Sequence, residues 1–150
     1  MSYSTFDDMP RRNRRLILRD EVDIVVGTVG SNVAPVMQRI FIENKRFLII
    51  PSWESVTREG EDLIIELDPG QAFGTGDHPT TRMCLQLLEK ADVSGKRVAD
   101  VGCGSGILSI GASLCGAAEV AGVDIEALSV EVAIENASRN KVEARFVEGD

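Results

Sequence analysis

The segment RVADVGCGSGILSI, from Arg97 to Ile110, constrains the fold of this chain more than any other part of the sequence. Five residues with the apolar pattern of a short buried strand lead into glycines at positions 102, 104 and 106, and an apolar helical repeat follows directly. A glycine turn in this context is typical of α/β folds that bind a ligand, because bare backbone lets a ligand approach the N–H groups at the helix start. We therefore predict an α/β fold with a binding site at this turn.

The neighbouring elements extend this unit in both directions. Strands are expected at 97–101, 119–124 and 144–150, and they alternate with helical repeats, the first of which follows Pro79. This order predicts a Rossmann-like, doubly wound parallel sheet. The helices are expected to bury the apolar stripes Cys84, Leu87, Leu88 and Ala91, then Ile107, Ile110, Gly111 and Leu114, then Val130, Ala133, Ile134 and Ala137.

The chain before position 69 has a different pattern. Strands are expected at 22–29, 38–42, 46–50 and 61–68, with a hairpin turn at 43–45 and a loop whose Trp53 packs against the rest of the protein. We predict a β-rich segment over 1–68, which either docks a partner or covers the sheet, and a Rossmann-like domain over 69–150. Three parallel strands are few, and the strand at 97–101 would keep an open edge. The chain is therefore expected to be an N-terminal portion of a longer protein.

Asp100 indicates which ligand the glycine turn accepts. A dinucleotide fingerprint requires glycine or alanine at position 107, where this chain has Ile107. Two unit charges about 4 Å apart interact by roughly 4 kcal/mol at an effective dielectric near 20. Asp100 would thus repel a pyrophosphate and attract a sulfonium or an ammonium group. S-adenosylmethionine carries both cations, together with a carboxylate suited to the helix N-terminus.

A second carboxylate, Asp124, ends the next expected strand, 22 positions after Gly102. At that position its oxygens can accept hydrogen bonds from both ribose hydroxyls of a nucleoside. Asp150 either faces the adenine amine or belongs to a simple turn, and the sequence leaves this open. Cys103 is expected to be a small filler within the turn. The candidate cofactor-binding residues from this reasoning are Asp100, Gly102, Gly104, Gly106 and Asp124.

The cysteines and the absence of long apolar runs indicate a cytoplasmic, non-membrane protein. Cys84, Cys103 and Cys115 are odd in number and lack C-x-x-C spacing, which argues against a disulfide framework or a zinc site, so no metal is expected. No apolar run of 18 residues exists, and the first 15 residues do not resemble a secretory signal.

Charge is distributed unevenly along the chain. Residues 1–47 carry 8 Lys and Arg against 6 Asp and Glu, whereas residues 48–150 carry 8 against 18. The acidic second part disfavours nucleic acid as a partner. Only the basic run from Arg11 to Arg15 could contact RNA or an acidic protein, and a solvated tail is the simpler interpretation.

The stretch AFGTGDHPTT, Ala72 to Thr81, resembles the loop that precedes the first Rossmann strand in methyltransferases of ribosomal large-subunit protein eleven, the PrmA family. RFLIIPSWE, LIIELDPG and DVGCGSGIL are also similar to that family, so the resemblance runs from about Arg46 to the end of the chain. Only about 45 residues precede it, and they do not look like the family's substrate-recognition domain.

The resemblance implies a class I, S-adenosylmethionine-dependent methyltransferase acting on a protein, ribosomal in origin, through a lysine. It places a cofactor contact on Thr81, the first loop glycine on Gly102 and the ribose acid on Asp124. His78 is expected to cap or brace the loop rather than take part in chemistry, and no catalytic residue can be named. A small-molecule methyltransferase of the same fold and a cofactor-binding fragment without turnover remain alternatives.

Overall fold

The computed structural model describes residues 24–26, 38–41, 46–68 and 78–149. They form two β-sheets and three helices. The four-stranded sheet has the order β1-β5-β6-β7, with β1 at Ile24–Val26, β5 at Arg97–Val101, β6 at Glu119–Asp124 and β7 at Arg145–Glu148, and all of its pairs are parallel. The α/β fold and the three strands expected after position 96 are confirmed.

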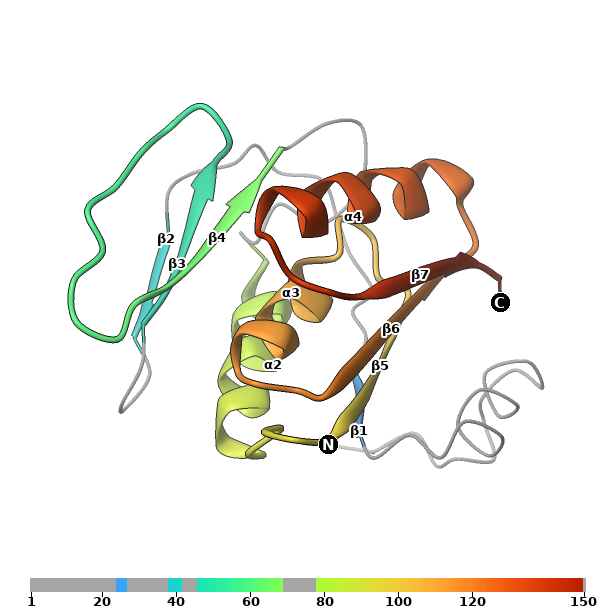
Figure 1. Cartoon of the computed structure of the whole chain (residues 1–150), viewed down its shortest axis with the longest axis horizontal. Coiled ribbons are helices and arrows are strands. Elements are labelled where there is room, and N and C mark those ends of the chain that lie inside the picture. The colour runs from blue at the N-terminus through green and yellow to red at the C-terminus, as the bar shows by residue number, and fades with distance from the viewer. Residues whose placement is uncertain (1–23, 27–37, 42–45, 69–77, 150) are drawn as a thin grey trace.

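The second sheet has three strands in the order β2-β3-β4. β2 (Gln38–Phe41) is antiparallel to β3 (Arg46–Pro51), as the expected hairpin requires, and β4 (Leu63–Leu67) pairs in parallel with β3. A wide loop over residues 52–62 connects the two parallel strands (Figure 1).

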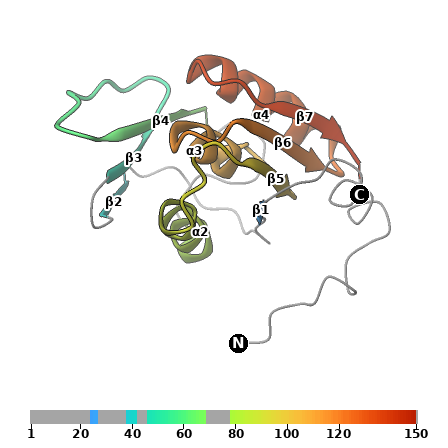
Figure 2. The same ribbon diagram turned by 60° about the horizontal axis from the view of Figure 1, so that its bottom comes forward.

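The helices α2 (Pro79–Lys90), α3 (Ile107–Leu114) and α4 (Ala127–Arg139) join the two sheets into one core. Figure 2 shows α3 between α2 and α4. α3 also contacts β4 on one side and β5 and β6 on the other. One apolar cluster therefore runs from Phe47 and Ile65 of the three-stranded sheet through Leu85 of α2 and Ile110 of α3 to Val120 of β6.

The structure corrects the expected place of the first strand. Residues 24–26 do not join the β-rich segment but pair with β5, with Ile24 beside Val98 and Val26 beside Asp100. The edge of β5 that was expected to be open is thus occupied by β1. A pairing between residues more than 70 positions apart leaves no local signal in the sequence.

Four side chains that were expected to be buried are exposed, and one of them is Ala91 at the end of the predicted α2 stripe. Trp53 is 67% exposed and does not pack into the core. In α2 the buried residues are Thr81, Leu85 and Leu88, while Leu87 is 61% exposed. In α4, Ala133 and Ala137 are buried as expected, but half of Ile134 is exposed.

Within the residues that the structure describes, no helix is both long enough and apolar enough to cross a bilayer. The predicted division of the chain at residue 68 stays a prediction. Asp150 and the run from Arg11 to Arg15 lie outside the described residues.

Candidate functional site

The loop between β5 and α3 is built on glycines with left-handed backbone. The φ angles of Gly102, Gly104 and Gly106 are 71°, 52° and 79°, a region in which a side chain would be strained. The N–H groups of Gly102 and Cys103 both donate to the carbonyl of Val123, at 2.8 and 3.0 Å. The loop is thereby fixed against the carboxyl end of β6.

Asp124 forms the opposite side of this turn. Its Oδ2 accepts the N–H of Gly104 at 2.8 Å, and its Oδ1 accepts the N–H of Glu126 at 3.0 Å. A carboxylate oxygen has two lone pairs, so each oxygen keeps capacity for a ligand hydroxyl. The structure thus brings together the second loop glycine and the acid that the sequence singled out.

Asp100 lies beneath the loop and is 1% exposed. Its Oδ2 accepts both the N–H of Ser109, at 3.0 Å, and the hydroxyl of Ser109, at 2.7 Å. Ser109 is the third residue of α3, and the N–H groups of the first turn of a helix have no intrahelical acceptor. The bond from the Ser109 N–H to Asp100 satisfies one of these groups. Oδ1 of the same carboxylate is buried and has no hydrogen-bond partner among the residues that the structure describes.

Burial raises the pKa of Asp100 from 3.8 to about 6; the two bonds from Ser109 oppose this shift, and the charge of Asp124 adds to it. Near neutral pH the carboxylate is therefore mostly ionised, although it is fully buried. A buried anion with one unpaired oxygen is suited to receive a cationic group of a ligand.

The two carboxylates affect the pKa values of two nearby cysteine thiols. Burial, and after it the charge of Asp100, raises the pKa of the Cys84 thiol. Burial also raises the pKa of Cys103, and Asp100 and Asp124 raise it further. Both groups therefore remain neutral thiols at pH 7, which suits packing and not nucleophilic chemistry.

His78 caps α2, as the sequence suggested. Its Nδ1 accepts the N–H of Thr80 at 3.3 Å and lies 2.6 Å from the Thr80 hydroxyl, and Pro79 is the first helical residue. Thr81 is buried, and its N–H donates to the carbonyl of His78 at 3.0 Å. A contact between Thr81 and a cofactor stays a prediction.

Two polar residues of this region were not found from the sequence. Ser109 and Asn136 are both fully buried, and each makes hydrogen bonds to the loop or to Asp100 beneath it. In the sequence, each of them is a polar residue within an apolar helical stripe, and this could have indicated a buried polar contact. Ser109 lies three positions after Gly106, and Asn136 lies three positions after Ala133.

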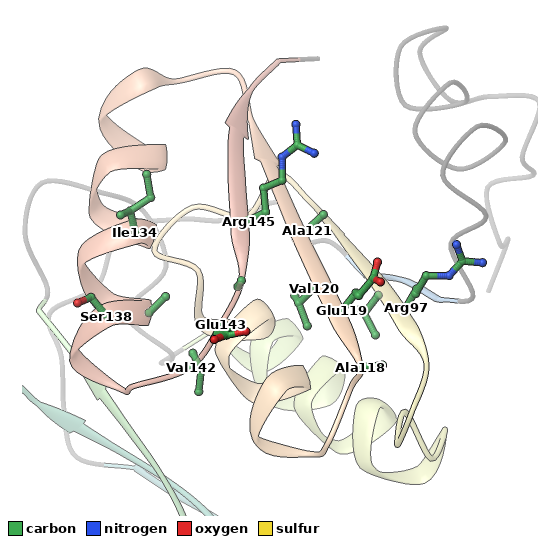
Figure 3. A pocket seen from close by; sticks show the side chains of 13 residues that line it. Arg97, Ala118, Glu119, Val120, Ala121, Ile134, Ser138, Val142, Glu143 and Arg145 are labelled. Atoms are coloured by element: carbon green, nitrogen blue, oxygen red, sulfur yellow. The ribbon is translucent and has the colours of Figure 1, made fainter.

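A separate hollow of about 830 Å³ lies at the opposite end of the sheet (Figure 3). Arg97, Glu119 and Arg145, the first residues of β5, β6 and β7, are at its rim, and Ile134 and Ser138 of α4 face it. The glycine loop and Asp124 follow the carboxyl ends of the strands, where α/β sheets bind their ligands. This hollow is therefore not the candidate site.

Comparison with known proteins identifies the family. The sequence model of the ribosomal protein L11 methyltransferases (PrmA) matches residues 41–149. The chain belongs to this family. The resemblance inferred from AFGTGDHPTT and DVGCGSGIL is thus confirmed.

Individual members of the L11 methyltransferase family show how far the similarity extends. A relative from Dictyoglomus thermophilum is 54% identical over 101 residues, which are 67% of this chain and 34% of the relative. One from Staphylococcus aureus (strain JH1) is 43% identical over 151 residues, covering 93% of this chain and 48% of the relative. The chain spans about a third to a half of the length of these curated relatives.

The alignment with the S. aureus relative corrects one expectation. Coverage of 93% of the chain requires that most of the first 45 residues also align with an L11 methyltransferase. The resemblance is thus not limited to the chain after Arg46.

The crystal structure of an L11 methylase from Lactobacillus delbrueckii subsp. bulgaricus supports the fold. It is 40% identical in sequence and superposes with a TM-score of 0.64 over 69% of this chain and 53% of that protein.

Proposed function

We propose that this chain binds S-adenosylmethionine at the Gly102–Gly106 loop and forms the cofactor-binding part of a methyltransferase that modifies a ribosomal protein. The observation that carries the proposal is the bond from Gly104 N–H to Asp124 Oδ2, because it joins the glycine turn and a nucleoside-type acid in one site. Membership of the L11 methyltransferase family supports the reaction class.

The charges of the site match the proposed ligand. Asp124 is the residue that we expect to accept the ribose hydroxyls, and its position at the carboxyl end of β6 supports this role. The unpaired Oδ1 of Asp100 offers a buried anionic acceptor for the ammonium group. Two carboxylates in one small site disfavour a pyrophosphate, so a dinucleotide is a poor fit.

S-adenosylmethionine supplies a methyl group that is already activated by its sulfonium. The residues of this chain then have the tasks of binding, orienting and excluding water, which place the methyl group in line with an attacking amine. A lysine acceptor has an unperturbed pKa of about 10.4 and must react in its neutral form. We assign the removal of that proton to no described residue.

We also propose a ribosomal protein as the partner and the cytoplasm as the compartment. A ribosomal protein substrate follows from the names of the relatives, and the acidic second part of the chain suits a basic protein of that kind. Cys84 and Cys103 are present as thiols, which supports a cytoplasmic location.

Titration calorimetry with S-adenosylhomocysteine tests the cofactor assignment. The chain should bind this product, and the ligand should raise its melting temperature, whereas NAD should do neither. Asp124→Ala should weaken binding more than tenfold, because two ribose hydroxyls lose a charged acceptor worth roughly 1.5–3 kcal/mol.

Asp124→Asn serves as the matched variant, since it keeps one oxygen for the N–H of Gly104 but removes the charge. Its affinity should lie between those of Asp124→Ala and the unsubstituted chain. Equal thermal shifts from S-adenosylhomocysteine and NAD would refute the assignment, and so would unchanged affinity in Asp124→Ala.

A further inference from the structure

Asn136 connects two segments that are far apart in the sequence. It lies in α4 and is 0% exposed. Its Oδ1 accepts the N–H of Asp68 at 3.0 Å, and its Nδ2 donates to the carbonyl of Ser105 at 3.0 Å. One buried amide thus bridges the backbone just after β4 to the backbone of the glycine loop.

The bridge requires a side chain with both a hydrogen-bond donor and an acceptor at this position. The Asp68 backbone offers a donor and the Ser105 backbone an acceptor, and only a side chain with both functions satisfies the two. A carboxylate would face the Ser105 carbonyl with a second acceptor, and a buried group without its partner costs about 1–3 kcal/mol. The Asn136 side chain is therefore specific for this pair of backbone groups.

The bridge contacts the glycine loop at Ser105, next to the glycine that is bonded to Asp124. Ser105 lies between Gly104, whose N–H is bonded to Asp124, and Gly106, whose N–H donates to the carbonyl of Cys103 at 2.8 Å. A shift of the Ser105 carbonyl would move both neighbours. The bond from Asn136 is thus a contact by which α4 holds the loop, in addition to the bonds to Val123 and Asp124.

We propose that Asn136 is a positioning residue of the cofactor site, which holds the glycine loop in register with the end of β4. This inference rests on the proposed function, because it assigns Asn136 a role in cofactor affinity beyond folding. Asn136 acts through the Ser105 backbone and is not itself assigned a contact with the ligand.

Asn140, one helical turn later, provides a matched control. Its Oδ1 accepts the N–H of Glu66 at 2.8 Å, and its Nδ2 donates to the Glu66 carbonyl at 2.7 Å and to the carbonyl of Asn136 at 2.8 Å. It therefore ties the same helix to the same strand but makes no bond to the glycine loop. The ion pair between Arg139 and Asp68, 3.7 Å long and partly exposed, adds little to this connection.

The first experiment compares affinity with stability in Asn136→Ala and Asn140→Ala. Both variants should lower the melting temperature, but only Asn136→Ala should weaken binding of S-adenosylhomocysteine, by about tenfold or more. Asn136→Ser, which can reach only one of the two backbones, should also bind weakly. Equal loss of affinity in the Asn136 and Asn140 variants would overturn the proposal.

The second experiment needs no ligand and so separates this inference from the proposed function. Amide hydrogen exchange should accelerate about tenfold or more at Asp68, Gly104 and Gly106 in an Asn136 variant, and at Glu66 alone in Asn140→Ala. Glycine-loop amides that exchange alike in both variants would overturn the positioning role. A chain that binds no S-adenosylhomocysteine but shows the expected exchange pattern would refute only the proposed function.

Discussion

At the scale of single residues, Asp100 combines a structural and an electrostatic role at a cost in stability. One oxygen caps α3 through Ser109, and the other is buried without a hydrogen-bond partner in the described part of the chain. Because burial raises its pKa to about 6, ionisation of Asp100 disfavours the folded state. The shift corresponds to about 3 kcal/mol at neutral pH. Residues that sacrifice stability in this way are frequent at ligand sites.

Asp100→Asn should stabilise the chain while weakening its proposed cofactor affinity. A folded-state pKa above the unfolded one means that stability falls as pH rises through about 6. The asparagine variant has no such loss, so its advantage should grow by about 1 kcal/mol between pH 5.5 and pH 8, measured by urea unfolding. At pH 8 it should bind S-adenosylhomocysteine about tenfold more weakly.

Asp92→Asn is the control for charge alone, because Asp92 is exposed at the end of α2. An advantage of Asp100→Asn that does not change with pH would show that Asp100 does not titrate over the pH range of the experiment.

Residue identities at the carboxyl ends of the parallel strands could be predicted in part. Glycine has few alternatives where φ is positive, and an acid at the end of the second strand has a fixed place in the fold, so Gly104 and Asp124 were identifiable. Ser109 and Asn136 were not, because their partners, Asp100 and the Ser105 carbonyl, are fixed only by the packed structure. Polar residues in apolar stripes indicate that such a partner exists but not which group it is.

At the scale of elements, packing between helices determines which apolar face is buried where the sequence periodicity allows more than one. The α2 sequence offers Leu85, Leu87 and Leu88, which allow two neighbouring apolar stripes. Leu85 is buried because it fits over Gly111 of α3, where an added Cβ would lie 2.5 Å from Leu85 Cδ2. The sequence therefore predicted the helix and its start correctly, but the facing helix determined which stripe is buried.

A similar close approach in the sheet gives a stability prediction. A Cβ on Gly122 of β6 would lie 2.5 Å from the ring of Phe146 in β7 and 3.1 Å from Cys103 Cβ. Gly122→Ala should therefore lower the free energy of unfolding by about 1–3 kcal/mol, although alanine is the better strand residue in isolation. Urea denaturation gives the value directly.

The double variant Gly122→Ala with Phe146→Leu tests the cause. If the Phe146 ring is the obstacle, Gly122→Ala should lower the free energy of unfolding by at least about 0.5 kcal/mol less when Phe146 is replaced by leucine. Couplings between contacting residues are typically of this size. Simple additivity of the two substitutions would place the obstacle elsewhere.

At the scale of the whole molecule, the contacts between distant segments could not be predicted from the sequence. The alternation of strands and helices predicted β5, α3, β6, α4 and β7 in order. It gave no indication that β1 extends the same sheet, or that α3 would pack against β4 and so unite both sheets in one core. Contacts of this kind depend on surfaces from many positions, whereas periodicity reports only which face of a single element is apolar.

The position of Trp53 has a practical consequence for optical measurements. This indole is the chain's only tryptophan, and because it is largely in water already, its fluorescence should scarcely shift to longer wavelength when the protein melts. Circular dichroism should nevertheless report a cooperative transition in the same samples, and a strong red shift at that midpoint would contradict the exposed placement. The same indole becomes a sensitive reporter in another respect, since any macromolecule that covers the 52–62 loop should shift its emission to the blue.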